Sequence, residues 1–215
     1  FFDSGIDLST RLSAGWHHFA VSTHPERTRF YLNGQPAGDC ASTRSMLRLN
    51  GAGDSVEVPA HSSPTVAVTV AVWARSATPT WNSDGVLASK RPAFILHLNV
   101  NTRSIGFSLQ INGVWRTADF APADIQSWHH YCGTYDGVSI RLYIDGVQVK
   151  ETQVSGTIAA SSSSLYLGRD PGSGVDHRFA VDLGEVAYFS TALSGPQVRK
   201  LCFESVATNE PFLIG

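Results

Sequence analysis

The sequence predicts an all-β protein, a sandwich of two antiparallel sheets. Short runs in which apolar and polar residues alternate recur along most of its 215 residues, and a period of two is typical of strands with one buried face. Glycine is plentiful, with 19 residues, as tight turns require. Only one segment has helical character, which excludes a helical bundle and favours a sandwich or barrel.

The segment 139–152 shows the strand pattern most clearly. Asp145-Gly146 separates two alternating runs, and Asp-Gly is a strong hairpin signal because both turn positions need positive φ. Before this turn, Ile140, Leu142 and Ile144 point to one side and the residues between them to the other. In chain order, we expect strands at 47–50, 55–58, 65–74, 85–89, 93–99, 104–111, 114–120, 128–134, 139–144, 147–152, 164–168 and 179–189.

Two elements have further support in the sequence. In the run 65–74 the valines at 66, 68, 70 and 72 are expected on one buried face. The helix is expected at 194–203, because Ser194 followed by Gln197 forms a capping box and Pro196 suits a first turn. Its residues Val198, Leu201 and Cys202 are expected to face a sheet.

A repeat divides the chain. Gly15-Trp16-His17-His18 recurs as Ser127-Trp128-His129-His130, and the match continues without a gap from Arg29-Phe-Tyr-Leu-Asn-Gly34 to Arg141-Leu-Tyr-Ile-Asp-Gly146. Each copy is a predicted β-meander. We expect an incomplete repeat at 1–46, a complete domain at 47–207 and a C-terminal tail at 208–215. The first copy is either the remainder of a truncated domain or a set of strands that packs on the complete one.

Charge and hydropathy exclude two classes of partner. The formal net charge is −2, from 16 Lys and Arg and 18 Asp and Glu, and the pI of about 6.5 lacks the basic footprint of a nucleic-acid-binding protein. No apolar run approaches the ~20 residues that cross a bilayer. We therefore expect neither nucleic-acid binding nor membrane insertion.

Cysteine and histidine do not indicate a metal site. Cys40, Cys132 and Cys202 are widely spaced, with no C-x-x-C pair. Buried thiols are the simpler interpretation, and Cys132 fits it best because it continues a strand; the disulfide pairing stays open, with Cys40 and Cys202 the pair to test first. The His-His pairs at 17–18 and 129–130 cannot chelate one ion side by side, since neighbouring strand residues point to opposite faces.

Five pieces of sequence resemble laminin G-like domains of the concanavalin A-like lectin/glucanase superfamily. They are Leu47-Arg-Leu-Asn-Gly-Ala-Gly-Asp-Ser-Val-Glu-Val-Pro59, Val68-Thr-Val-Ala-Val-Trp-Ala-Arg75, the meander from Trp128 to Gly146, Leu165-Tyr-Leu-Gly-Arg169, and Phe179 to Ser194. The resemblance implies a concanavalin A-like jelly roll. It also implies a structural Ca²⁺ between the loop of the first strand and the closing strand, where Asp54 and Asp182 match. Asp170 and Asp176 suggest a second type of site, although turn formation, in which Asp side chains bond their own backbone, is the simpler explanation of all four aspartates.

Catalysis is not expected. Glucanases on this fold usually carry two glutamates in an E-x-D-x-E strand, with carboxyl groups about 5–5.5 Å apart, and this sequence has no such run. The nearest stretch, Asp182-Leu-Gly-Glu185, places its two acids on opposite faces of a strand. G-x-S-x-G and H-E-x-x-H are also missing from the sequence.

Exposed aromatic residues beside planar polar groups are the pattern that binds sugars. Trp81, Asn82 and Asp84 fall in a predicted loop rich in Pro and Thr, and Trp115 and Arg116 follow the Asn112-Gly113 turn. These five residues are the candidate ligand-binding set, although Trp115 also suits a core position. Trp16, Trp73 and Trp128 lie in strand patterns and are expected in the core.

The sequence thus favours a non-catalytic, extracellular or cell-surface binding module of a larger multidomain protein. Its expected partner is a glycan, bound directly or with help from calcium, in a role such as adhesion. One alternative is a structural or protein–protein interaction domain that contacts a neighbouring extracellular protein, because unpaired strands invite partners. A weaker alternative is an accessory module of a glycoside hydrolase.

Overall fold

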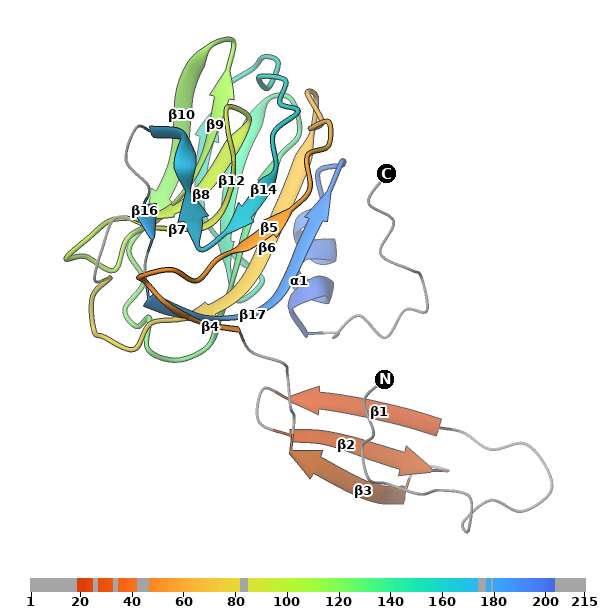
Figure 1. The fold of residues 1–215 in the computed structure, drawn as a ribbon. Coiled ribbons are helices and arrows are strands. Elements are labelled where there is room, and N and C mark those ends of the chain that lie inside the picture. Colours follow the sequence, from red (N-terminus) through yellow and green to blue (C-terminus); the bar gives the residue numbers. More distant parts are fainter. Residues whose placement is uncertain are drawn as a thin grey trace. The chain divides into compact units, whose positions relative to one another are not determined.

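A computed structural model describes residues 19–24, 27–32, 35–41, 47–81, 85–173, 177–178 and 180–203. These residues divide into two compact units, here named the N-terminal unit (residues 19–41) and the main unit (residues 47–203). Figure 1 shows both units and labels most of their elements. Among the described residues, no helix has the length and apolar character needed to span a bilayer.

The N-terminal unit is an antiparallel meander in the order β1-β2-β3. Its strands are β1 (Phe19–His24), β2 (Arg27–Leu32) and β3 (Gln35–Ala41). β1 and β2 pair without interruption, whereas β2 and β3 shift register between Phe30 and Tyr31.

The main unit consists of two six-stranded antiparallel sheets. Sheet 1 has the order β10-β9-β8-β7-β14-β5, and sheet 2 the order β13-β12-β11-β6-β17-β4. The strands of sheet 1 are β5 (Val56–Val58), β7 (Val86–Lys90), β8 (Phe94–Leu98), β9 (Ile105–Ile111), β10 (Val114–Phe120) and β14 (Leu165–Leu167). Those of sheet 2 are β4 (Leu47–Asn50), β6 (Val68–Arg75), β11 (His129–Tyr135), β12 (Ser139–Ile144), β13 (Val147–Gln153) and β17 (Ala180–Phe189). The prediction of a jelly-roll sandwich is confirmed.

The core lies between the two sheets and follows the alternation in the sequence. In β6, Val68, Val70 and Val72 are at most 1% exposed, and burial of such a side chain stabilises the fold by about 1.5–3 kcal/mol. Val66 was expected on the same face, but it precedes the strand and is 69% exposed. Gly133 leaves room for a partner from the facing sheet, because a Cβ there would lie 2.2 Å from the ring of Phe107.

Two predicted hairpin turns have the backbone that their sequences require. Asn112 and Gly113 have φ of 49° and 80°, and Asp145 and Gly146 have φ of 52° and 77°. Positive φ at both central residues matches the right-handed twist of the flanking strands. The Asn112 turn therefore fixes which residues of β9 and β10 share a face.

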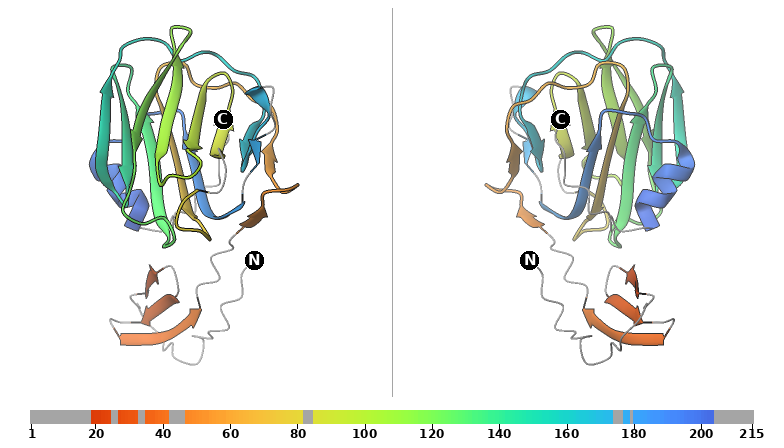
Figure 2. Two further views of the ribbon diagram at one scale, coloured as in Figure 1. Left: turned by 90° about the vertical axis from the view of Figure 1, so that its left-hand side faces the viewer. Right: turned by 90° about the vertical axis from the view of Figure 1, so that its right-hand side faces the viewer.

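Helix α1 (Gly195–Phe203) covers part of the outer face of sheet 2 (Figure 2). Ser194 caps it by donating its backbone N–H to Oε1 of Gln197 at 2.8 Å, as the capping box predicts. Val198 and Cys202 are 0% and 4% exposed, and Val198 packs with Ala71, Cys132 and Tyr143. Both helix contacts were expected from the sequence.

The cysteine predictions have mixed outcomes. Cys132 is a buried free thiol, and its burial raises the pKa of the thiol, so the buried-thiol interpretation is confirmed there. Cys202 is also buried. The side chain of Cys40 lies outside the described residues, so its pairing with Cys202 stays a prediction.

One charged side chain lies wholly inside the sandwich. Lys90 ends β7 and is 0% exposed, and its Nζ donates to the carbonyl oxygen of His61 at 2.7 Å and to that of Ser163. Desolvation lowers the pKa of this ammonium group. The side chain thereby holds together two loops that are far apart in the sequence.

Candidate functional site

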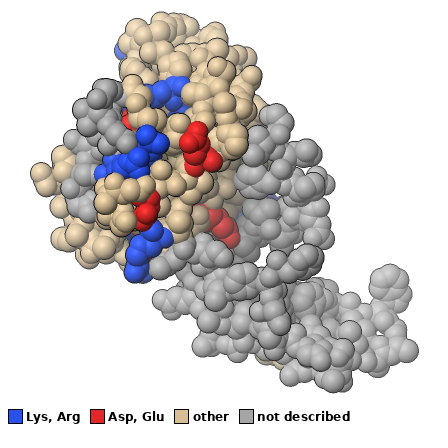
Figure 3. Space-filling view, in the orientation of Figure 1, with Lys and Arg blue, Asp and Glu red and all other residues tan. Residues whose placement is uncertain are grey.

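The outer face of sheet 1 is the candidate functional surface. Helix α1 packs on sheet 2 and leaves this face to polar and aromatic side chains. Strand register brings the following residues to it, from β10 across to β5: Trp115, Thr117, Asp119, Gln110, Ser108, His97, Ile95, Ser89, Tyr166 and Glu57. Figure 3 shows acidic and basic side chains interspersed on a mostly uncharged surface.

A guanidinium group stacked on an indole ring lies at one end of this face. Cζ of Arg91 lies 5.2 Å from the ring centroid of Trp115, a cation–π distance. The Arg91 group also binds Asp170, with Nε at 2.8 Å from Oδ1 and Nη2 at 2.7 Å from Oδ2. The Asp170 side chain is 3% exposed, against 28% for Arg91, so the fork of the arginine is fixed while part of it faces solvent.

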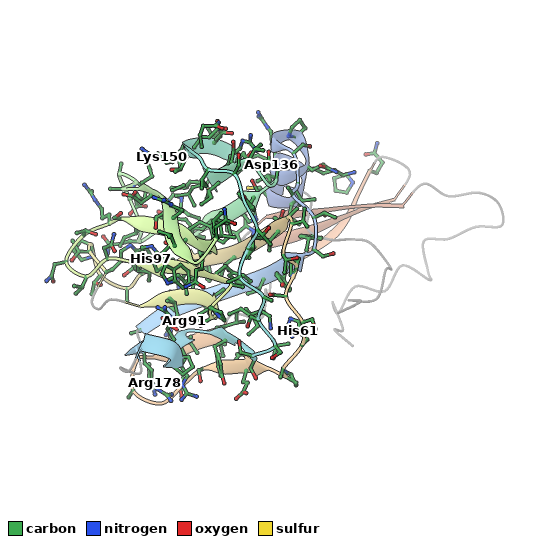
Figure 4. All side chains as sticks on the ribbon, turned by 90° about the horizontal axis from the view of Figure 1, so that it is seen from above. His61, Arg91, His97, Asp136, Lys150 and Arg178 are labelled. Carbon is green, nitrogen blue, oxygen red and sulfur yellow. The ribbon has the colours of Figure 1, made fainter. Side chains whose placement is uncertain are left out.

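Several groups from distant segments hold Arg91 in place. Ser161 and Ser163 each donate a hydroxyl hydrogen bond of 2.7 Å to its carbonyl oxygen. Asp170 belongs to a small hairpin of β15 (Arg169–Asp170) and β16 (His177–Arg178), joined by the 3₁₀ turn η2 (Pro171–Ser173) and residues 174–176. A Cβ at Gly172 would lie 2.3 Å from Cδ of Arg91, so only glycine allows this approach. In Figure 4, Arg91 and Arg178 lie on the opposite side of the sandwich from Asp136 and Lys150.

A hydrogen-bonded line crosses the neighbouring strands. Nε2 of His97 lies 3.0 Å from Oγ of Ser108, which lies 2.5 Å from Oγ1 of Thr117. Gly106 makes room for the imidazole, because a Cβ there would lie 2.5 Å from Nε2 of His97. The line fixes these three side chains from β8, β9 and β10 as a polar floor.

A second aromatic residue lies toward the other edge of the sheet. Cζ of Arg169 lies 5.4 Å from the ring centroid of Tyr166, and the Tyr166 hydroxyl donates to Oε1 of Glu57 at 3.2 Å. Ser164 donates to the same oxygen at 2.7 Å. The face therefore presents a stacked arginine and ring toward each end.

This arrangement suits recognition of a flat, hydroxyl-rich ligand. A half-buried indole offers apolar area, a fixed guanidinium offers directed donors, and an amide offers both a donor and an acceptor. The amide is Gln110, which lies opposite Trp115 in register and whose side chain makes no hydrogen bond to any residue the structure describes.

Comparison with known proteins agrees with this architecture. The Laminin G 3 family model, described as the concanavalin A-like lectin/glucanases superfamily, matches residues 50–199. The chain belongs to this superfamily. No curated protein shows a significant sequence match.

Solved structures of the same fold include a heptameric SAP-like pentraxin from Limulus polyphemus. It is 15% identical to this concanavalin A-like chain, with a TM-score of 0.56 over 73% of this chain and 81% of the pentraxin. The binding domain of botulinum neurotoxin serotype D in complex with N-acetylneuraminic acid is 15% identical, with a TM-score of 0.58 over 73% of this chain and 41% of that one. A third structure is of botulinum neurotoxin type C, whose cell entry depends on interaction with two ganglioside molecules. It is 15% identical, with a TM-score of 0.58 over 73% of this chain and 42% of that one. At these identities the likeness shows the fold alone.

The first predicted set of ligand-binding residues does not lie on the surface. Trp81 is 1% exposed and packs edge-on against Tyr131, with ring centroids 6.5 Å apart. The expectation that it lies in an exposed loop is wrong, because hydrogen bonds to Thr102 and Asn101 draw its backbone against the 99–104 turn. Asn82 and Asp84 lie outside the described residues.

The second predicted set is divided between the two faces of β10. Trp115 lies opposite Gln110 on the outer face, whereas Arg116 lies opposite Leu109, which is in the core. Arg116 is exposed, but its side chain points to the opposite face of the edge strand β10 from that of Trp115. Sequence reasoning missed Gln110, which the register of the Asn112 turn implies. It also missed Arg91, which lies 79 residues from Asp170 and carries no local signal.

The two predicted calcium ligands are engaged with protein groups. Asp182 binds Nε of Arg48 at 2.7 Å through one oxygen and Nε of Arg75 at 2.9 Å through the other. Asp54 accepts the backbone N–H of Asn50 at 3.1 Å, and the nearby carbonyl of Gly53 accepts a bond of 2.5 Å from Arg178. As arranged, these groups do not fit one Ca²⁺ ion, because guanidinium groups already bind the Asp182 carboxylate and the Gly53 carbonyl. Among the described residues, no three His, Cys, Asp or Glu side chains gather as a metal site.

Two tryptophans expected in the core lie elsewhere. Trp73 and Trp128 are half-buried on the outer face of sheet 2, where Trp73 contacts the ring of His130 at 5.5 Å and Trp128 stacks with Arg75 at 5.1 Å. Trp16 lies outside the described residues. The other tandem histidine, His129, binds Oδ2 of Asp145 through Nδ1 at 2.7 Å, as a structural side chain.

The ion pair of His129 predicts a pH dependence of stability. The hydrogen bond to Asp145 raises the pKa of His129 above its unfolded value of about 6.5. The pair therefore stabilises fully below that pH and is lost as pH rises through the folded pKa. We expect the stability difference between wild type and His129→Gln to shrink by about 0.2–1 kcal/mol from about pH 5.5 to about pH 8.5, measured by urea unfolding. A difference that stays constant with pH would contradict this assignment.

Proposed function

We propose that this chain is a non-catalytic, extracellular glycan-binding module whose binding surface is the outer face of sheet 1 around Trp115. One observation carries the proposal: the Trp115 ring, the Arg91 guanidinium fixed by Asp170, and the Gln110 amide converge on one open sheet face. An indole stacks on the C–H face of a pyranose, and the two planar polar groups bond its hydroxyls.

The carboxylates near this surface support a binding role over catalysis. Asp170 is bound by Arg91 through both oxygens, and Glu57 accepts from Ser164 and Tyr166. Neither of these two carboxylates is arranged as a free general acid or base. Asp119, on the edge strand of the same face, has no second free carboxylate beside it among the described outer-face residues. The neighbouring structure with N-acetylneuraminic acid shows that another protein of this fold binds a sugar. The extracellular setting is part of the proposal, and its support is the family resemblance alone.

Replacing Trp115 tests the proposal. We expect Trp115→Ala to weaken glycan affinity at least about tenfold, or ~1.4 kcal/mol, and Trp115→Phe to retain part of it. Glycan-array screening followed by calorimetry on the best hit measures this, with calcium and then with a chelator. We expect no effect of the chelator, because arginines already neutralise Asp182.

Arg116→Ala is the matched control, because it removes a neighbouring side chain on the other face of the same strand. It is expected to leave glycan affinity unchanged. A blank array together with a co-purifying protein partner would replace glycan binding with the protein-interaction alternative.

A further inference from the structure

A guanidinium group stacked on an indole ring also occurs on the outer face of sheet 2. Cζ of Arg75 lies 5.1 Å from the ring centroid of Trp128, and Nε of Arg75 donates to Oδ2 of Asp182 at 2.9 Å. The Asp182 side chain is 11% exposed, against 36% for Arg75. The three groups have the same chemistry and nearly the same spacing as the arginine, tryptophan and aspartate of the candidate site on sheet 1. Here too, a largely buried carboxylate fixes a guanidinium group that faces solvent.

A second indole widens the apolar area of this face. Trp73 lies two residues before Arg75 in β6, on the same side of the strand, and its ring contacts that of the buried His130 with centroids 5.5 Å apart. A Cβ at Gly184 would lie 3.0 Å from Cβ of Trp73 and 3.5 Å from Cζ3 of Trp128. Glycine at the register shift of β17 therefore lets the two indoles share this part of the sheet.

Helix α1 covers a different part of the same face. It packs on a row across the strands that includes Ala71 and Cys132, which lie opposite one another in register. Arg75 is four residues beyond Ala71, or about 13 Å along β6. Next to it, Arg48 donates through Nε and Nη2 to Asp182 at 2.7 and 3.1 Å, and its side chain is 66% exposed. Solvent therefore reaches this surface beside the helix.

We propose that this surface is a second glycan-binding site, which makes the module bivalent. It is named the sheet 2 platform and consists of Arg48, Trp73, Arg75, Trp128 and Asp182. The inference rests on the proposed function, because it assigns the same chemistry to the same arrangement: an indole stacks on the C–H face of a pyranose, and guanidinium donors bond its hydroxyls.

The position of the platform gives the second site its consequence. The outer faces of two packed sheets point away from each other, with about 10 Å between the sheets, so one chain binds two glycans at once and links them. The sheet 2 platform is the weaker site, because Asp182 already accepts bonds from both Arg48 and Arg75, which leaves fewer donors for a ligand.

Calorimetry with the best hit of the glycan array tests this site. We expect two binding events in the wild-type chain, the weaker with a Kd at least about tenfold higher. Trp115→Ala is expected to remove the stronger event and leave the weaker, and Trp128→Ala to do the reverse. A single event that Trp115→Ala abolishes would overturn the second site and leave the proposed function intact. A blank array for the wild-type chain would instead refute the proposed function.

An exposed side chain gives a test that does not depend on folding of the tryptophan variant. Arg48→Met keeps both indoles, and we expect it to weaken the weaker event at least about threefold and to leave the stronger one unchanged. Lys150→Met is the matched control, because it removes an exposed cation from β13 at the other edge of sheet 2. Equal effects of these two variants on the weaker event would overturn the assignment.

Cross-linking measures bivalency directly. We expect the wild-type chain to aggregate beads coated with the hit glycan, because each chain joins two beads. Trp115→Ala and Trp128→Ala are each expected to prevent this aggregation, since either leaves one site per chain. Aggregation that persists in Trp128→Ala would overturn the second site, because the links would then come from the sheet 1 surface of associated chains.

Discussion

Replacing Arg91 with methionine is expected to lower the free energy of unfolding of the main unit by about 3–5 kcal/mol. Asp170 is 3% exposed, and its two oxygens depend on the Arg91 guanidinium. Methionine keeps the length of the stem but leaves a buried carboxylate without its counter-charge, with the Gly172 N–H at 3.4 Å as the one described group still directed at Oδ1. Urea unfolding followed by tryptophan fluorescence measures this, since four of the five tryptophans lie in the main unit.

Two further variants separate charge from packing in this prediction. Arg91→Met combined with Asp170→Asn removes both charges and is expected to recover part of the loss, because a neutral buried pair escapes the penalty of a lone ion. Arg141→Met is the matched control: Arg141 binds Asp136 at 2.6 Å, but the two side chains are 26% and 30% exposed. Its loss is expected at about 0.2–1 kcal/mol. A loss below about 1 kcal/mol for Arg91→Met as well would show that the Asp170 pair behaves like a surface pair.

Arg91 also illustrates which parts of the site can be derived from sequence. Local sequence patterns were enough to predict the strands of the two main sheets, the two hairpin turns and the capped helix. The alternation with a period of two, the Asn-Gly or Asp-Gly pair and the Ser-x-x-Gln box each determine structure over only a few residues. The Arg91–Asp170 pair joins the end of β7 to a hairpin 79 residues along the chain. The sequence around either residue contains no local pattern that predicts the other as its partner. Only the register of β9 and β10 carried information about the site, since it places Gln110 beside Trp115.

The errors in the tryptophan predictions have a related cause. Trp73 follows the alternation of β6 on the face opposite to Val72, so its outer position was implied by the pattern that placed the valines inside. The prediction for Trp81 was wrong in the opposite direction: it was expected at the surface, because a loop rich in Pro and Thr was taken to be exposed. The loop folds back, with Asn101 donating to the Trp81 carbonyl at 2.9 Å, and this closure depends on a turn about twenty residues later in the chain.

The burial of Trp81 leads to the second large effect. Trp81→Ala is expected to destabilise the main unit by about 3–5 kcal/mol, because it leaves a cavity at one of the largest fully buried side chains. The indole Nε1 has no hydrogen-bond partner among the described residues, so Trp81→Phe removes a desolvated donor along with some volume and is expected to cost less than half as much. Urea unfolding of both variants checks the order.

Binding measurements on the same variants decide what kind of residue Trp81 is. If it supports the core, Trp81→Ala lowers stability, while the molecules that stay folded bind glycan with unchanged affinity. Trp115→Ala is expected to show the reverse, with affinity lost and stability nearly kept, because its ring is only half-buried on the outer face. An unchanged unfolding curve for Trp81→Ala together with lost glycan binding would place Trp81 at the ligand and remove the outer face of sheet 1 from that role.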